Sequence, residues 1–332
     1  MLASFVRHYL ELPEKPRKVV CLGGGVGTAQ VLKGLRDYPY QLTAIVSMAD
    51  DGGSAGRLRR AFSVLPPGDL VNCLTALSSE ESVLNLLFRY RFAGKRYGKD
   101  TDLSGQKLGN LIFVALTDIY KGDTNKALEE FSKIISPSGR VLPATIDNVN
   151  IWAKNKDGQK VYGEQNIDLG KFPGSKALKE VHIDPEGAKA YKVTIEAIRE
   201  ADVLIAGPGD LFTTILPVLI VSQIKKEFIK SKAKKIFILN TTNKSFETPN
   251  FRASDYLETI EKHVQKNIFD KILINTNYAP KIPKGLKYKY VQYDRKNLLA
   301  FGGKILEGDF INTSFPLYHD SLKIAKAIEQ LI

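Results

Sequence analysis

The segment Gly23-Gly24-Gly25-Val26-Gly27-Thr28 holds the first residues whose types and spacing could do chemistry. Glycines let a backbone approach a phosphate closely, and a helix that starts here would offer free N–H groups and the positive end of its dipole. Thr28 stands where the strict dinucleotide pattern G-x-G-x-x-G requires a third glycine, so NAD is not compelled. A tight turn without a ligand is the alternative. We expect this loop to bind nucleotide phosphates through Gly23, Gly24, Gly25, Gly27 and Thr28.

A second segment, Ala49 to Arg57, combines adjacent carboxylates with glycines and an arginine. A carboxylate there could meet a ribose hydroxyl, hold Mg²⁺, or position an acceptor hydroxyl for phosphoryl transfer. Ser54 could cap a short helix, and Arg57 could contact a phosphate bidentately. A plain Asp-Gly turn is the alternative. We expect ligand contacts from Asp50, Asp51, Gly52, Gly53, Ser54 and Arg57. Asp50 and Asp51 would be the metal ligands and, in a transferase only, the catalytic residues.

Polar side chains also stand near the starts of two helices that the sequence predicts. Asp69 follows a Pro-Pro-Gly turn and is expected to be an N-cap, and Asn72 is the polar exception among apolar neighbours one turn later. Lys107 and Asn110 fall in or near the first turn of the most regular amphipathic helix, where an anion could bind. Arg91 is either an ordinary surface charge or a diphosphate ligand. We therefore add Asn72, Arg91, Lys107 and Asn110 to the predicted site.

The order of strand and glycine loop recurs in Gly207-Pro208-Gly209-Asp210. Ligands of doubly wound sheets gather at the carboxyl ends of the strands, so we expect this loop at the same sheet edge as the first. A further strand ends in Asn240-Thr241-Thr242-Asn243, which offers uncharged groups suited to a base or sugar. The ligand contacts predicted in this half of the chain are Gly207, Pro208, Gly209, Asn240 and Thr242.

A parallel sheet is needed to bring these segments together. A strand at 18–22, a helix at 28–37 and a strand at 42–47 form a β-loop-α-β unit typical of the start of a doubly wound α/β fold. The later rhythm of the apolar residues predicts strands at 202–206, 235–240 and 271–275, and helices at 191–200, 254–264 and 320–331.

At about residue 139 the pattern of the sequence changes from predicted helices to predicted strands. Strands are expected at 141–145, 149–154 and 159–164, the last two joined by a hairpin at Lys156-Asp157-Gly158. We predict a lead-in at 1–17 and one α/β domain at 18–332, with a β-rich insertion at 139–190.

The composition favours an ordinary cytoplasmic protein. Of 332 residues, 43% are hydrophobic and 25% charged, and no apolar run reaches the ~20 residues that span a bilayer or forms a signal peptide. The net charge of +12 is spread along the chain without an RNA-binding signature, so no nucleic-acid partner is expected. Cys21 and Cys73 are expected to be buried thiols rather than a disulfide framework. His8, His182, His263 and His319 lack metal-ligand spacing and are expected at surface or core positions.

Several of these segments, in this order, resemble the bacterial gluconeogenesis factor family, which is related to 2-phospho-L-lactate transferase in the CofD-like superfamily. The resemblance covers about residues 18–330 and is carried by the following motifs: Gly23-Gly24-Gly25-x-Gly27, Ala49-Asp50-Asp51-Gly52-Gly53-Ser54-x-Gly56-Arg57-Leu58, Pro66-Pro67-Gly68-Asp69-x-x-Asn72, Leu108-Gly109-Asn110-Leu111, Gly139-Arg140-Val141-Leu142-Pro143, Gly207-Pro208-Gly209 and Ile215-Leu216-Pro217.

The resemblance implies a Rossmann-like three-layer fold and a cytoplasmic location. In the bacterial branch it implies binding of UDP-sugars such as UDP-N-acetylglucosamine and a role in cell shape and wall synthesis during gluconeogenic growth. In the transferase branch it implies Mg²⁺-dependent transfer of a phospholactyl group from a guanosine diphosphate-linked donor to a deazaflavin. By that analogy Asp50 or Asp51 would meet the acceptor hydroxyl or the metal, and Arg91 would meet the acceptor. The segment Gly139–Pro143 and the hairpin after it resemble the gluconeogenesis factor branch more.

Some positions depart from the family pattern. Val26 replaces a threonine, Gln106-Lys107 replace a histidine-containing pair, and Asp210 replaces a serine. A loop that is usually Met-Thr-Gln-Pro-Gly-Glu-Thr reads Thr241 to Thr248 here. Asp210 would repel a phosphate unless a metal lay between them.

Three functions compete. A nucleotide-sugar-binding regulator without turnover is favoured, as a homo-oligomer, specifically a dimer. A Mg²⁺-dependent transferase of phosphorus-containing groups stays open because every carboxylate that it needs is present, and Mg²⁺ is the one cofactor that the sequence leaves open. An NAD-dependent oxidoreductase is disfavoured by Thr28 in the glycine pattern.

Overall fold

The first strand, Arg17–Gly23 (β1), is buried from Val19 onward, as its run of apolar residues requires of a strand covered on both faces. The computed structural model describes residues 15–79, 82–96, 99, 102–135, 138–301 and 304–332. Most of the predicted lead-in, 1–14, lies outside the described residues. Among those residues, no helix has the length and apolar character needed to cross a bilayer.

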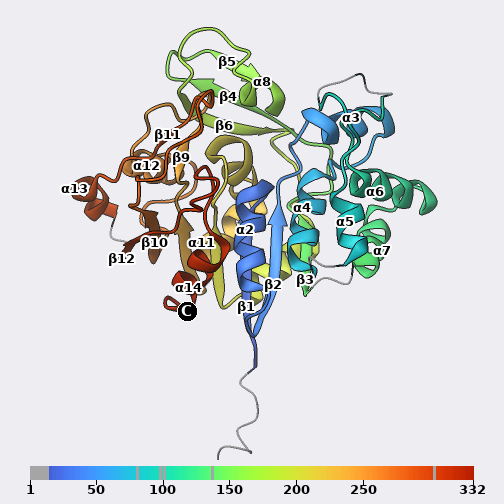
Figure 1. Cartoon of the computed structure of the whole chain (residues 1–332), viewed down its shortest axis with the longest axis horizontal. Helices are drawn as coiled ribbons and strands as arrows, with labels where there is room; N and C mark the ends of the chain where they lie inside the picture. Colours follow the sequence, from blue (N-terminus) through green and yellow to red (C-terminus); the bar gives the residue numbers. More distant parts are fainter. Residues whose placement is uncertain (1–14, 80–81, 97–98, 100–101, 136–137, 302–303) are drawn as a thin grey trace, which may run out of the picture.

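Seven strands form one parallel sheet with the order β12-β10-β8-β7-β1-β2-β3. Their bounds are Arg17–Gly23 (β1), Tyr40–Val46 (β2), Gly139–Pro143 (β3), Val203–Ala206 (β7), Lys234–Ile238 (β8), Lys271–Asn275 (β10) and Lys304–Gly308 (β12). The sheet and the helices around it confirm the predicted Rossmann-like α/β fold (Figure 1).

Along the chain, most of the helices fall between these strands. They are Gly25–Leu35 (α2), Gly53–Phe62 (α3), Gly68–Leu77 (α4), Val83–Arg89 (α5), Leu108–Ile119 (α6), Thr124–Ile135 (α7), Glu164–Asp168 (α8), Lys192–Glu200 (α9), Leu216–Leu219 (α10), Ser222–Lys230 (α11), Ala253–His263 (α12), Arg295–Leu298 (α13) and Ser321–Glu329 (α14), with a π-helical turn at Leu211–Ile215 (η1) and a 3₁₀ turn at Leu299–Phe301 (η2).

The connections place helices on both faces of the sheet. The chain passes from β1 to β2 through α2, and from β3 back across β2 and β1 to β7 through α9. These two crossovers run in opposite directions, so right-handed connections put α2 and α9 on opposite faces. α4 and α14 pack against α2, and α11 packs against α9. The result is a three-layer sandwich with its core on both sides of β1.

The predicted β-rich insertion is divided in the structure. β3 joins the edge of the main sheet beside β2, whereas Asn150–Asn155 (β4), Lys160–Tyr162 (β5) and Leu178–Asp184 (β6) form a separate three-stranded sheet in the order β5-β4-β6. The predicted hairpin between β4 and β5 is confirmed by their antiparallel pairing. Thr242–Asn243 (β9) and Lys289–Tyr290 (β11) form a further, short antiparallel pair that is separate from both sheets.

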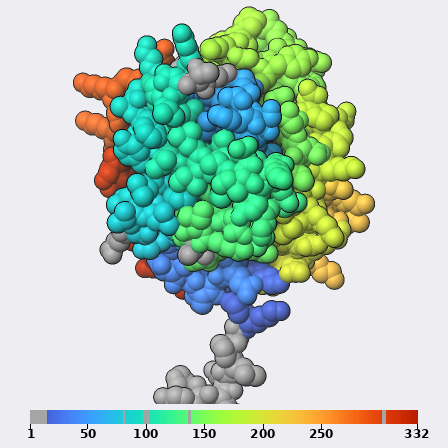
Figure 2. All heavy atoms as spheres, turned by 90° about the vertical axis from the view of Figure 1, so that its right-hand side faces the viewer, coloured from blue at the N-terminus to red at the C-terminus, as the bar shows by residue number. Residues whose placement is uncertain are grey.

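The small sheet stands above the main sheet, and α8 leans from it toward the carboxyl ends of the parallel strands (Figure 1). Figure 2 shows the flank formed by residues of α3 to α7, which makes a continuous surface under the small sheet. Cys21 and Cys73 are both free and buried, as expected.

Candidate functional site

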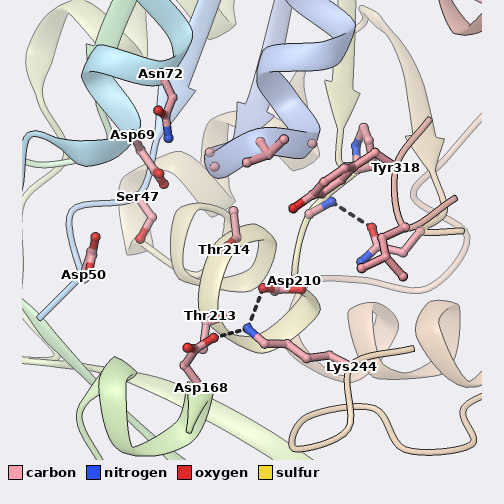
Figure 3. Close-up of a pocket in the computed structure, with 18 of the residues that line it drawn as sticks. Ser47, Asp50, Asp69, Asn72, Asp168, Asp210, Thr213, Thr214, Lys244 and Tyr318 are labelled. Carbon is pink, nitrogen blue, oxygen red and sulfur yellow. Dashed lines mark hydrogen bonds and ion pairs between the residues drawn. The ribbon is translucent and has the colours of Figure 1, made fainter. Parts of the chain in front are cut away.

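A cavity of about 550 Å³ opens at the carboxyl edge of the main sheet. It lies where β1 has β2 on one side and β7 on the other, which is the switch point at which ligands of doubly wound folds bind. Figure 3 shows its layout: the start of α2 stands in the middle, Asp50, Asp69 and Asn72 lie on one side, and Tyr318 on the other. Asp168, Asp210 and Lys244 lie in the lower half of the view.

The first glycine loop has the backbone that its sequence predicts. Gly23, Gly24 and Gly25 all have positive φ, with +62° at Gly25, a region that L-residues rarely adopt. The loop is closed by Thr28, whose Oγ1 accepts the Gly24 N–H at 2.9 Å. The helix α2 then begins without a side-chain cap from its N-cap residue, and its first residues, Gly25, Val26 and Gly27, line the cavity.

The two glycine loops meet, as the strand order predicts. β1 and β7 are parallel neighbours, and a Cβ on Gly27 would overlap the Pro208 carbonyl. The second loop is tied in turn to the end of β8, because the Gly209 N–H donates to Asn240 Oδ1 at 2.8 Å. Glycine at position 27 is therefore needed for contact between the loops.

The sequence predicts Asp69 as the N-cap of α4, but in the structure Asp69 does not cap this helix. The N-cap position falls on Pro67, and the Asp69 carboxylate instead lies against the first glycine loop, where a Cβ on Gly24 would overlap it. Burial and the nearby charge of Asp50 raise the pKa of Asp69 to about 7, against an opposing hydrogen bond from the Gly25 amide. An acidic side chain thus already lies at the anion-binding end of α2.

Asp50 shares this side of the cavity. Its Oδ1 accepts the Gly52 N–H at 2.9 Å, yet burial raises its pKa to about 6. Glu164 on α8 also faces the cavity, and burial together with the charge of Asp50 raises its pKa well above the usual range. Three carboxyl groups with raised pKa values therefore surround one side of the ligand space, a feature common at functional sites.

Cationic side chains form the adjoining wall. Lys107 Nζ donates to Asn72 Oδ1 at 2.5 Å, so two predicted site residues lie in contact. Burial and the charge of Arg91 lower the pKa of Lys107 to about 8. Arg91 donates to Ser54 Oγ at 3.1 Å and to the Gly105 carbonyl at 2.7 Å, and Arg96 lies against Gly53. These cations can attract a phosphate to this wall.

Lys244 holds three carboxylates together at the bottom of the cavity. Its Nζ lies 2.6 Å from Asp210 Oδ2 and 3.0 Å from Glu247 Oε1, and it also pairs with Asp168 of α8. Glu247 has no exposed surface and also accepts hydrogen bonds from the Phe212 N–H at 3.1 Å and from Thr213 Oγ1 at 2.7 Å. Asp210 and Lys244 both lie at positions that depart from the family pattern, and in the structure they form an ion pair.

The remaining wall is uncharged and partly aromatic. It is formed by Asn240, Thr241, Thr242, Tyr288, Leu317, Tyr318 and His319. Burial lowers the pKa of His319 to about 4, so its ring is neutral at neutral pH. This wall suits a base or a sugar better than a phosphate.

Comparisons with known proteins identify the family of the chain. The model of the family "2-phospho-L-lactate transferase CofD" matches residues 19–311. The chain belongs to the CofD family. The gluconeogenesis factor of Bacillus subtilis is 38% identical over 328 residues, which cover 96% of this chain and 99% of that protein. The gluconeogenesis factor of Listeria monocytogenes is 39% identical over 318 residues, with 95% of each chain covered.

A solved structure shows the same fold. It is a member of the UPF0052 family from Bacillus halodurans, 36% identical, with a TM-score of 0.85 over 95% of this chain and 99% of that one. The predicted resemblance to gluconeogenesis factors and CofD-like proteins is thus confirmed for the family and the fold.

Most of the predicted ligand residues of this CofD-family chain line one cavity. They are Gly24, Gly25, Gly27, Asp50, Gly52, Gly53, Asn72, Arg91, Lys107, Pro208, Gly209, Asn240 and Thr242. The predicted residues that do not line it are Gly23, Thr28, Asp51, Ser54, Arg57, Asn110 and Gly207. Contact of any of them with a ligand stays a prediction.

Arg57 and Ser54 have structural partners instead of the expected ones. Arg57 is 1% exposed and donates to the carbonyls of Lys99, Asp102 and Ser104 at 2.6–3.0 Å, so its guanidinium binds these three residues rather than pointing into the cavity. Ser54 does not cap α3, because that helix begins one residue earlier, with Gly52 as N-cap.

Asp50 and Asp51 point in different directions, which bears on the predicted Mg²⁺ pair. Asp51 Oδ1 accepts the Gln165 N–H at 2.7 Å at the start of α8, so it anchors the small sheet. Asp51 also borders a second hollow of about 500 Å³ that contains Arg59 and Arg60. The structure therefore offers Asp50 alone of this pair to a cation in the main cavity, and the metal role of both stays a prediction.

Sequence reasoning missed several residues of the cavity. Asp168 and Glu164 come from α8 of the small sheet, and Tyr288, Tyr318 and His319 from late loops. Among the described residues, one group of acidic side chains is close enough to hold a metal, Asp168, Asp210 and Glu247, but the Lys244 ammonium already lies among them. The departures at Asp210 and at Thr241 to Thr248 were the one sequence signal for this cluster.

Proposed function

We propose that the cavity binds a nucleoside diphosphate sugar of the UDP-N-acetylglucosamine kind, with the diphosphate at the start of α2. The observation that carries this proposal is the meeting of two glycine loops at the start of α2, between a cationic wall and an uncharged one. Lys107, Arg91 and Arg96 would balance the phosphate charge, while the wall near Tyr318 would receive the nucleoside.

The protein would act as a cytoplasmic regulator without turnover, of the gluconeogenesis factor type, with an influence on cell shape and wall synthesis during gluconeogenic growth. The name of relatives that match almost the whole chain supports the gluconeogenesis factor type. A dimer remains the expected assembly. In this function the protein binds its ligand without converting it, and the shape of the ligand-bound cavity carries the regulatory signal.

Calorimetric titration tests this proposal. Pure protein is titrated with UDP-N-acetylglucosamine, GDP, GTP and NAD, each with and without Mg²⁺. We expect UDP-N-acetylglucosamine to bind without Mg²⁺ and NAD to fail. Binding of guanine nucleotides alone, with a requirement for Mg²⁺, would exclude the regulator.

Substitution at the cavity gives a second test. Asp50→Asn and Asp51→Asn are compared as separate variants, because only Asp50 faces the cavity. Asp50→Asn should change the affinity for UDP-N-acetylglucosamine by several-fold, whereas Asp51→Asn should leave it within about twofold. Lys107→Met should weaken binding at least about tenfold, since one charged contact contributes about 1.5–3 kcal/mol. Unchanged affinity in a folded Lys107→Met protein would remove the cationic wall from the site.

A Mg²⁺-dependent transferase is the second candidate, and one observation favours it. Burial and the charge of Asp50 raise the pKa of Asp69 to about 7, which suits a group that removes a proton from an acceptor hydroxyl near neutral pH. Asp50 would then be the residue to hold Mg²⁺, whose role would be to neutralise charge on the transferred phosphorus group. Phosphorus NMR of a nucleoside diphosphate-linked donor with an alcohol acceptor would detect such transfer, and its absence with bound donor supports the regulator.

A further inference from the structure

His319 has a feature that the proposed function leaves unused. Its side chain lines the cavity and is 3% exposed, yet Nε2 has no hydrogen-bond partner within the described part of the chain. Buried polar atoms are nearly always hydrogen-bonded, so an exception calls for an explanation, and a ligand group or a water molecule can supply the absent partner. Its place on a cavity wall makes a ligand group the partner of interest.

The state of the ring decides what that partner must be. The Leu239 carbonyl forms a hydrogen bond with the ring, and a carbonyl can only accept. Because Nε2 has no partner, this bond engages Nδ1–H. Burial lowers the pKa of His319 to about 4, so the ring carries one proton at neutral pH and Nε2 presents a lone pair. The absent partner must therefore be a hydrogen-bond donor.

Asn240 supplies the opposite polarity on the same wall. Its Oδ1 accepts the Gly209 N–H at 2.8 Å, which orients the amide and leaves Nδ2–H groups for donation. Thr241 Oγ1 donates to the Leu317 carbonyl at 3.0 Å and thereby fixes the segment before His319 against the end of β8. A donor and an acceptor are thus held beside the rings of Tyr288 and Tyr318.

A nucleobase matches this combination. Its edge carries adjacent N–H and carbonyl groups, and its planar face packs on aromatic side chains, which is how proteins read unpaired bases. A phosphate has no N–H group to donate, and it would gain nothing from a neutral histidine.

We propose that this wall is the nucleobase subsite, in which His319 Nε2 accepts the ring N–H of uracil and Asn240 donates to a neighbouring carbonyl. This inference rests on the proposed function, because it assigns one end of the ligand. It makes His319 the residue that selects a base with a free ring N–H, since a site built for a hydrogen bond strongly rejects an analogue that lacks it.

The experiment compares UDP with N3-methyl-UDP, in which a methyl group replaces the donor hydrogen. Both are titrated into the full chain, wild type and His319→Phe, with inorganic pyrophosphate as the control ligand. We expect the methyl group to weaken binding to the wild type at least tenfold, and to weaken binding to His319→Phe less than twofold. Pyrophosphate should bind both proteins equally, because it lacks the base.

The outcomes separate this inference from the proposed function. Equal affinity of the wild type for UDP and N3-methyl-UDP would overturn the His319 contact and leave a bound water as the partner of Nε2. Failure of UDP, UDP-N-acetylglucosamine and pyrophosphate alike would remove the proposed function together with the subsite. If His319→Phe does not fold, His319→Gln, which keeps an acceptor, takes its place and should retain part of the discrimination, and the wild-type comparison alone can still overturn the contact.

Discussion

The two glycine loops of the cavity differ in how nearby carboxylates are accommodated. Beside the first loop, burial raises the pKa of Asp69 to about 7 and that of Asp50 to about 6, so their charge varies with pH near neutrality. Beside the second loop, Asp210 lies 2.6 Å from the ammonium of Lys244, whose pKa is raised well above its usual value because the surrounding carboxylates outweigh its burial. The end of the cavity beside the first loop is therefore adjustable in charge, and we call it the adjustable end. The end beside the second loop is held by an ion pair, and we call it the fixed end.

This difference assigns the two ends different tasks. A fixed ion pair that links α8, the second loop and the 244–247 segment sets the shape of the cavity. A protonatable carboxyl group at the start of α2 makes the binding of an anion or a cation sensitive to pH. We expect loss of the ion pair beside the second loop to act mainly on stability, and loss of a carboxylate beside the first loop to act mainly on binding.

The largest effect is expected from Lys244→Met. This change leaves Asp168, Asp210 and Glu247 together without their ammonium, and removal of one partner from a buried ion pair costs about 3 kcal/mol or more. Urea denaturation should show that loss in the free energy of unfolding. Lys133→Met is the control, because Lys133 pairs with Glu129 and Glu130 on the surface and should change stability by less than about 1 kcal/mol. Similar losses in the two variants would contradict the idea of a fixed end.

Gly27→Ala tests the contact between the loops. The added Cβ would overlap the Pro208 carbonyl, and relief of such overpacking costs about 1–3 kcal/mol. Calorimetry should show a lower melting temperature together with weaker binding of UDP-N-acetylglucosamine. Gly187→Ala adds its Cβ where no described atom lies within 4 Å and should melt like the wild type. A normal melting temperature for Gly27→Ala would mean that the loops are not in contact.

The adjustable end predicts a pH dependence of ligand affinity. UDP-N-acetylglucosamine keeps its charge between pH 5 and pH 8, as a diphosphate diester, so changes in affinity report on the protein. Ionisation of Asp69 at pH values above about 7 places a negative charge beside the diphosphate, and affinity should fall by up to about fourfold between pH 5.5 and pH 7.5. Asp69→Asn should flatten this profile. Affinity that instead rises with pH would show that a cation bridges the carboxylates and the ligand.

Asp69 should also change stability with pH, in a direction fixed by its pKa. The unfolded chain releases this proton near pH 3.8 and the folded chain near pH 7, so the folded state holds more protons between those values. Stability therefore falls as the pH rises from about 4 to about 7. Denaturation of wild type and Asp69→Asn across that range measures the difference in slope.

The smallest effect is expected from Asp51→Asn. Its Oδ1 accepts the Gln165 N–H at 2.7 Å, and weakening this one bond at the start of α8 should cost about 1 kcal/mol. Hydrogen exchange at 164–168 should rise while that of β1 stays unchanged. Asp37→Asn, at a side chain 81% exposed, is the matched control. Loss of ligand binding in Asp51→Asn would return this residue to the site.

The sequence was sufficient to predict the loops at Gly23–Gly27 and Gly207–Gly209, because a buried strand followed by glycines has one common use in α/β sheets. It was insufficient for side-chain direction. Asp69 and Ser54 fitted the chemistry of helix caps, but the caps fall on Pro67 and Gly52, and both side chains contact neighbouring segments instead.

Residues that only topology brings together were also beyond the sequence. Asp168 belongs to a small sheet, Lys244 follows β9, and His319 precedes α14, with no periodic pattern to connect them. His319 looked like an ordinary core residue, and its unpartnered Nε2 becomes visible only when its neighbours are known. The strand β12 was missed as well, since its five residues, Lys304–Gly308, show no alternation of apolar and polar side chains.

The position of β1 between β2 and β7 has a consequence for how the chain folds during its synthesis. On the ribosome, β1, β2 and β3 can associate as soon as residue 143 has emerged, but β7 begins only at Val203. Until then β1 presents an open edge, and pairing across such a long stretch of sequence is slow. The second glycine loop therefore arrives late, and ligand binding should be gained only when the last third of the chain has been made.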